Sequence, residues 1–185
     1  MRNVFFTSDT HFCHDRGFIY EPRGFDTIKK HDEMIVENWN KVVKPQDIVY
    51  HLGDTLLNDN AQGLEYFKKL NGFIILIRGN HDTDVRLKML DFFCLSINVA
   101  CIEKINGYQF YLSHYPTITS SVENMAPLKH HLINLHGHTH SKNKFYQDMP
   151  FIYNVALDAH NHTPVSFDEV ITDIEKKKDE CLAML

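Results

Sequence analysis

The sequence predicts a layered α/β fold, and two patterns support this prediction. Short apolar runs typical of buried strands alternate with stretches whose apolar residues repeat at helical spacing. In addition, the most apolar run, residues 74–77, is followed within a few residues by Asn80, His81 and Asp82. Because ligands bind outside the carboxyl ends of the strands in open α/β sheets, polar residues in this position mark a candidate site.

Four other predicted strands end in the same way. Each apolar run is followed by side chains of the metal-ligand type, which are Asp9 and His11, then Asp54, then His114, and finally His138 and His140. Strand ends that offer only Asp, His and Asn imply one shared site at the carboxyl edge.

The first half of the chain alternates strands with helices. Strands are expected over residues 2–8, 47–52 and 73–78. A helix is expected over 27–43, with Asp26 as its N-cap and Trp39 on its apolar face. Another begins at the capping box of Asp59 and Gln62, carries Phe67 in the core, and ends before Asn71-Gly72. A third is expected over 84–93, whereas 12–25 reads as a loop.

In the second half of the chain, the sequence predicts a hairpin, two further strands and a final helix. Residues 97–105 and 108–113 flank Asn106-Gly107, a strong two-residue turn signal. Residues 115–130, with two prolines, are expected to cover the site as a loop, and strands are expected over 132–136 and 151–157. The last helix opens with a capping box of Ser166 and Glu169, and its apolar positions are Val170, Ile174, Cys181 and Leu185.

Composition favours one soluble domain spanning residues 1–185. Hydrophobic content of 43% and charged content of 23% are ordinary, and a net charge of −5 offers no basic footprint for strong nucleic-acid binding. The unusual number is 13 histidines, since imidazole is the commonest metal ligand. A monomer and a dimer both fit the sequence.

The cysteines and the apolar runs indicate a cytoplasmic location. Cys13, Cys94, Cys101 and Cys181 form no C-x-x-C pair, and we expect free thiols in a reducing compartment. The N-terminal apolar stretch is too short for a signal peptide, and no run approaches the ~18 residues of a membrane span.

The strand-end residues have the chemistry of a metal site. Oxygen and imidazole donors without thiolate are typical of sites for Mn, Fe, Zn, Co or Ni, whereas a closed structural zinc site would favour Cys. Among these metals we favour manganese. The donors are too many for one ion and about right for two. Two neighbouring cations need a shared carboxylate, and Asp54 is the natural bridge.

Five blocks in order carry a family resemblance: Asp9-x-His11, Gly53-Asp54, Gly79-Asn80-His81-Asp82, His114 and Gly137-His138-x-His140. From residue 4 to about 158 the chain resembles the calcineurin-like metallophosphoesterases. The run from Ser8 to His14, with Trp39-Asn40 and the stretch from Tyr50 to Asp54, is similar to their small single-domain bacterial and phage members. The resemblance implies a four-layer α/β/β/α sandwich with two mixed sheets flanked by helices.

The resemblance also implies roles for the residues. One metal would be held by Asp9, His11 and His140, and the other by Asn80, His114 and His138, with Asp54 bridging. A hydroxide between the metals would attack phosphorus. His81 would protonate the leaving group, Asp82 would fix the orientation of His81 and favour its protonated form, and Asn80 would also contact phosphate.

The chain departs from the family's Ser/Thr phosphatase branch, where Gly-Asp is followed by Asp-Arg-Gly. Here Gly53-Asp54 precedes Thr55, so the phosphate-binding arginine of that branch is absent. Arg23 is our first candidate for substrate contact, followed by Arg78 and then Arg16. His14 either lines the site or contacts phosphate as a further substrate-binding candidate, or it faces solvent.

The expected function is therefore hydrolysis of small phosphoesters, with diesters favoured and monoesters possible. A nuclease and a non-catalytic metal-binding scaffold for protein contacts remain as alternatives. His51 is expected to be a core or ligand-supporting residue. Asn154 and Asp158 either orient ligands or make an ordinary turn. The other histidines are expected at the surface or in loops, and they are His31, His130, His131, His160 and His162.

Overall fold

The computed structural model describes residues 2–120 and 126–183, and its framework is two mixed β-sheets. The first sheet has the order β4-β3-β2-β1-β9 and the second β5-β6-β7-β8. The strands of the first are β1 (Val4–Thr7), β2 (Ile48–His51), β3 (Phe73–Ile77), β4 (Cys94–Asn98) and β9 (Val165–Ser166). Those of the second are β5 (Ala100–Ile105), β6 (Tyr108–Ser113), β7 (Leu132–His136) and β8 (Ile152–Asn154).

Parallel pairing brings the functional strand ends to one edge. Strands β1 to β4 run parallel, and only β9 is antiparallel within the first sheet. In the second sheet β6, β7 and β8 are parallel and β5 is antiparallel to β6. A bridge between Ser8 and Ala156 joins the two sheets just beyond the ends of β1 and β8.

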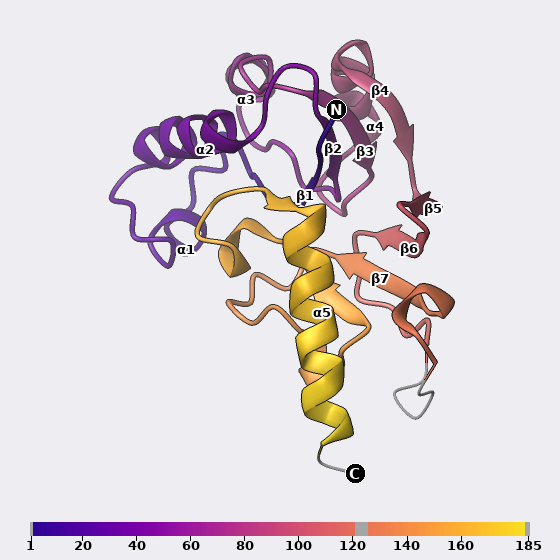
Figure 1. Cartoon of the computed structure of the whole chain (residues 1–185). Coiled ribbons are helices and arrows are strands. Elements are labelled where there is room, and N and C mark those ends of the chain that lie inside the picture. The colour runs from indigo at the N-terminus through magenta and orange to yellow at the C-terminus, as the bar shows by residue number, and fades with distance from the viewer. Residues whose placement is uncertain (1, 121–125, 184–185) are drawn as a thin grey trace.

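Helices flank the sheets (Figure 1). They are α1 (Gly17–Tyr20), α2 (Ile28–Val42), α3 (Asn60–Phe67), α4 (Asp84–Leu90) and α5 (Phe167–Leu182). Buried residues of α2 and α3, including Trp39 and Phe67, pack on one face of the first sheet. Its other face, with Phe6, meets the second sheet and the apolar side of α5. The predicted architecture of two mixed sheets flanked by helices is thereby confirmed. Among the described residues, no helix has both the length and the apolarity to span a bilayer.

Local sequence signals place several boundaries correctly. The Asp59 side chain accepts a hydrogen bond from the Gln62 backbone N–H, and Ser166 accepts one from Glu169, so both predicted N-caps are present. The cap of α2 was predicted one residue early. Thr27 accepts from the Lys30 backbone N–H, whereas Asp26 pairs with the ammonium group of Lys30.

The strand predicted at 97–105 is confirmed only over residues 100–105. Residues 94–98 form β4 at the edge of the first sheet, and after Val99 the chain enters the second sheet as β5. Neither Gly nor Pro interrupts residues 94–105, so no strong turn signal marks the crossing. The hairpin turn itself is confirmed, with φ of 50° at Asn106 and 87° at Gly107.

Other boundaries differ more modestly. The predicted 12–25 loop contains the one-turn helix α1, and the 84–93 helix ends at Leu90, followed by a 3₁₀ turn. Within the 115–130 segment, Leu128–His130 form a 3₁₀ turn, whereas 121–125 lie outside the described residues, as does Leu185. All four cysteines are free, as expected.

Trp39 anchors α2, and its replacement should be costly. The ring is fully buried, stacks near His51 and donates from Nε1 to the Asn71 carbonyl oxygen at 2.9 Å. We expect Trp39→Ala to lower the free energy of unfolding by about 3–5 kcal/mol in urea denaturation. Val42→Ala, on the same helix but 36% exposed, should change it by about 0.5 kcal/mol or less. Equal losses would show that α2 is not anchored through this ring.

Candidate metal centre

The residues predicted from the strand ends converge at the carboxyl edges of β1, β2, β3, β6 and β7. In the first group of ligands, His11 Nε2 lies 3.7 Å from Asp9 Oδ1 and 3.1 Å from His140 Nε2. His140 Nε2 is itself 3.7 Å from Asp9 Oδ1. Three ligand atoms of the kinds that bind divalent cations thus face one point.

A second group lies beside the first. Asn80 Oδ1 is 2.9 Å from both His114 Nε2 and His138 Nδ1. Asp54 stands between the groups, because its Oδ2 is 3.5 Å from His114 Nε2 and 3.7 Å from His11 Nε2. This is the position that a bridging carboxylate would need.

The surroundings of Asp9 fit a cation. Its Oδ2 accepts hydrogen bonds from the Ser8 hydroxyl and the His138 backbone N–H, whereas the buried Oδ1 has no hydrogen-bond partner among the described residues. A buried carboxylate oxygen without a partner is costly unless a positive charge compensates it.

Neighbouring charges shift the pKa values of His114 and Asp9. Burial alone would lower the pKa of His114, but contact with Asp54 and the charge of Asp9 outweigh it and raise that pKa to about 9. The pKa of Asp9 is held well below its usual range, because His11 and His140 outweigh the effect of burial. Both shifts reflect the close pairing of carboxylates with imidazoles at this site.

Several of the predicted ligands have a strained backbone. Asp9, His11, Asp54, His138 and His140 all have φ between 48° and 70°, a region that L-residues seldom occupy. Strain of this kind persists where the surrounding structure imposes it, and it clusters at functional sites.

Glycines let the strand-end loops approach one another. A Cβ on Gly137 would lie 2.4 Å from Asp9 Oδ2, and one on Gly79 would lie 2.2 Å from Asp54 Oδ1. On Gly53, which has φ of 96°, it would lie 2.4 Å from the Gly79 backbone nitrogen. The glycines in three of the motif blocks are therefore required by close packing around the carboxylates.

The role expected for Asp82 is corrected by its contacts. Its carboxylate is buried and accepts hydrogen bonds from the backbone N–H groups of Asp54, Thr55 and Gly79, and from the Thr55 hydroxyl. The side chain thus turns inward and ties the β2 and β3 loops together, instead of orienting the His81 ring. The adjacency of the two residues in sequence was misleading.

His81 and His14 lie on a cavity of about 390 Å³ above the ligands. The cavity is lined by His11, His14, Phe18, Ile19, Asp54, Asn80, His81, His138 and His140. The side chain of His81 is 41% exposed, and its Nε2 is 3.9 Å from Asp54 Oδ2. His14 Nδ1 is 3.2 Å from His11 Nδ1. Of the placements expected for His14, the structure therefore has the one at the site and not the one facing solvent.

The arginines predicted to contact substrate do not line this cavity. Arg23 is 6% exposed, and its guanidinium binds Asp158 behind the ligands. Arg78 pairs with Asp84, and Arg16 is exposed. The structure thus favours a supporting role for Arg23, because burial and its existing bonds keep it from substrate.

Sequence reasoning missed several residues around the cavity. Tyr115 stacks edge-on against His138 at 4.7 Å between ring centroids, and Arg86 donates to the His81 carbonyl oxygen. Phe18 and Ile19 reach the cavity because α1 turns them toward it. Only Tyr115, which follows His114 directly, carried a sequence signal. His51 is buried and lies 3.0 Å from the Thr10 hydroxyl, as a supporting residue would.

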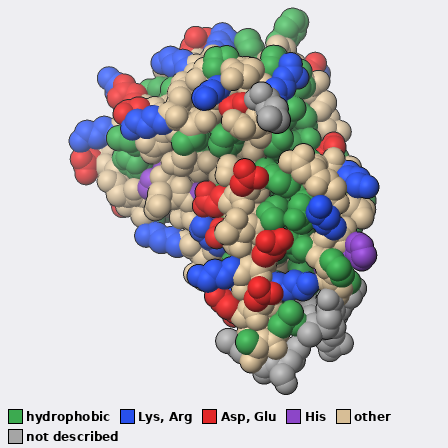
Figure 2. Space-filling view, in the orientation of Figure 1, with side chains coloured by type: hydrophobic (Ala, Val, Ile, Leu, Met, Phe, Trp, Pro, Cys, Tyr) green, Lys and Arg blue, Asp and Glu red, His purple; other side chains and the backbone are tan. Residues whose placement is uncertain are grey.

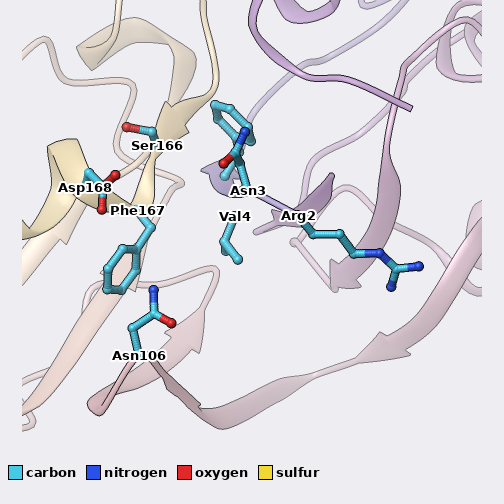
Figure 3. Close-up of a pocket in the computed structure, with 8 residues that line it drawn as sticks. Arg2, Asn3, Val4, Asn106, Ser166, Phe167 and Asp168 are labelled. Carbon is cyan, nitrogen blue, oxygen red and sulfur yellow. The ribbon is translucent and has the colours of Figure 1, made fainter. Parts of the chain in front are cut away.

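A larger cavity, of about 530 Å³, lies at the other end of β1 (Figure 3). It is lined by Arg2 and Asn3, which precede β1, by Val4, by Asn106 and by the residues that begin α5. It contains none of the predicted ligands. Size therefore does not identify the functional site here, whereas the convergence of ligand atoms does.

Gly137→Ala should weaken metal binding, because the added methyl group would displace Asp9 or Ser8. We expect the affinity for Mn²⁺ to fall at least about tenfold in calorimetric titration. Gly107→Ala is the matched control. Its φ of 87° makes alanine strained, but the nearest atoms lie 3.7 Å away in Lys129, so stability should fall while Mn²⁺ affinity is retained. Unchanged Mn²⁺ affinity in Gly137→Ala would contradict this view of the loop packing.

Comparison with known proteins agrees with the geometry. Residues 2–157 match the model of the calcineurin-like phosphoesterase superfamily domain. An uncharacterised protein of Methanocaldococcus jannaschii is 33% identical, covering 96% of this chain and 94% of that protein, and the gene 66 protein of mycobacteriophage D29 is 29% identical over 95% and 99%. A solved Aquifex aeolicus protein of unknown function is 28% identical, with a TM-score of 0.72 over 93% of this chain and 99% of that one. The chain belongs to the calcineurin-like phosphoesterase superfamily.

Proposed function

We propose that this protein is a phosphodiesterase that uses two divalent metal ions to hydrolyse small phosphodiesters. Manganese is the metal that we favour. The observation that carries the proposal is the pair of ligand groups that share Asp54 in one cavity beside His81. When bound, two such ions supply Lewis acidity and lower the pKa of water at the site. The chain's own residues then determine which ester is accepted and how its leaving group departs.

The charge of the cavity favours diesters. The described residues that line it include neither Lys nor Arg, and Arg23 is already paired with Asp158. A phosphomonoester dianion is typically held by an additional cation, often a bidentate arginine. A diester carries one negative charge and needs no such partner. Asn80, exposed at the cavity, is placed to contact phosphate oxygens.

His81 is placed to act as general acid. Its backbone N–H donates to Asp54 Oδ1 at 2.8 Å, and its carbonyl oxygen accepts from Arg86, so the main chain is held from two sides. The ring is left free to face the cavity. It can therefore donate a proton to the leaving-group oxygen as the phosphorus–oxygen bond breaks.

The alternatives have less support. The visible face of the molecule interleaves Lys and Arg with Asp and Glu (Figure 2), and the net charge is −5, so strong nucleic-acid binding is not expected. A scaffold without activity would not need a proton donor beside converging ligands. We also place the protein in the cytoplasm.

Hydrolysis of bis-p-nitrophenyl phosphate and p-nitrophenyl phosphate by the Mn²⁺-loaded protein tests the proposal. We expect kcat/KM for the diester to exceed that for the monoester, and chelator treatment to abolish both activities until Mn²⁺ is restored. Asp54→Asn should lose activity together with metal. Faster monoester turnover would overturn the diester assignment, and absence of turnover with two ions bound would overturn the enzymatic one.

A change of leaving group tests His81 separately. His81→Ala should reduce kcat on a diester with an alkyl leaving group by about 10²–10⁴-fold, because an alkoxide needs protonation as it leaves. The loss on bis-p-nitrophenyl phosphate should be much smaller, since p-nitrophenolate leaves without a proton. An equal loss on both substrates would show that His81 has a different role.

A further inference from the structure

Arg23 and Asp158 form a buried ion pair directly behind the first ligand group. Arg23 Nε donates to Asp158 Oδ1 at 2.9 Å, and Nη2 donates to Asp158 Oδ2 at 2.7 Å. The two side chains are 1% and 9% exposed. Such two-pronged pairing fixes the plane of the carboxylate as well as its position.

Asp158 in turn contacts His140. Its Oδ2 lies 3.2 Å from His140 Nδ1, on the opposite side of the ring from the Nε2 that faces Asp9 and His11. A hydrogen bond from Nδ1–H to a carboxylate leaves the lone pair on Nε2, which is the atom needed for a metal.

Arg23 connects this pair to two further segments. Nη2 also donates to the Asp9 carbonyl oxygen at 2.9 Å, and Nη1 lies 2.9 Å from His31 Nε2 on α2. His31 Nδ1 is 2.8 Å from Asp32, whose other oxygen accepts from the Cys13 backbone N–H. His31 is fully buried, so its expected place at the surface was wrong. The network joins α2 and both sheets at the first ligand group.

The second ligand group is supported differently. His114 Nδ1 is 2.7 Å from the Leu52 carbonyl oxygen, which fixes its ring through the backbone of the β2 loop. Asn80 and His138 are exposed at the cavity. The buried ion pair therefore acts on one group and not on the other.

We propose that Asp158 and Arg23 are positioning residues that set the affinity of the first ligand group for its metal by holding His140 with Nε2 toward Asp9 and His11. This inference rests on the two-metal site of the proposed function. Loss of a partner that orients a metal-binding histidine typically weakens metal affinity roughly 10- to 100-fold. The second group, supported by Leu52, should be unaffected.

Titration of chelator-treated protein with Mn²⁺ in a calorimeter tests the inference. The unaltered protein should bind two ions, and Asp158→Asn should weaken one site by roughly 10- to 100-fold while leaving the other unchanged. Asp173→Asn is the matched control. Asp173 Oδ2 accepts from Tyr153 and Lys144 at 2.6 and 2.7 Å, and neither partner is a predicted metal ligand, so its loss should lower the Tm with both Mn²⁺ affinities retained.

A double-variant cycle separates positioning from general stability. In a His140→Ala background, Asp158→Asn should change the weakened affinity by less than about twofold, because its effect acts through the missing imidazole. Should Asp158→Asn fail to fold, Arg23→Lys keeps the charge but loses the two-pronged geometry, and it should weaken the same site about tenfold.

The outcomes distinguish the two proposals. Fewer than two ions bound by the unaltered protein would overturn the two-metal function itself. Two ions bound equally well by the unaltered protein and by folded Asp158→Asn or Arg23→Lys would overturn the positioning role alone. An undiminished effect of Asp158→Asn in the His140→Ala background would do the same.

Discussion

Asp54 is the residue on which the arrangement of the centre depends. One carboxylate oxygen faces His11 and His114 from the two ligand groups, and the other accepts the His81 backbone N–H. Its own backbone carbonyl accepts from the His11 N–H, and its N–H donates to Asp82. The loops after β1, β2 and β3 thus meet at this single residue. Their mutual positions, and with them the spacing of the ligands, follow from bonds that converge there.

Such convergence requires an unfavourable backbone, and the structure compensates for it nearby. Five ligand positions have positive φ, at a cost of about 1–3 kcal/mol each. The inward-facing carboxylate of Asp82, with four hydrogen bonds, and the close approach that Gly53, Gly79 and Gly137 allow are what hold these loops in place. Gly79 and Gly137 let their loops lie directly against the carboxylates of Asp54 and Asp9, where any side chain would clash.

The sequence predicted which side chains converge at this edge better than it predicted the contacts of their neighbours. Asp9, Asp54 and Asn80 follow apolar runs, and parallel strands necessarily bring such residues to one edge, so local pattern was sufficient. The direction in which Asp82 points depends on the turn around it. The partner of Arg23 lies 135 residues away, in a segment that local pattern cannot pair with it. The crossing after β4 was missed for a related reason, since a strand-like stretch without Gly or Pro fits either sheet equally well.

The two ligand groups differ in exposure, and this difference follows from the fold. Asp9 and His11 are buried between the strand ends, and the Arg23–Asp158 pair closes the space behind His140. In the second group only His114 is buried, because Asn80 and His138 stand on loops that border the cavity. His140 of the first group also borders the cavity, so each group combines buried residues with residues that a substrate can reach.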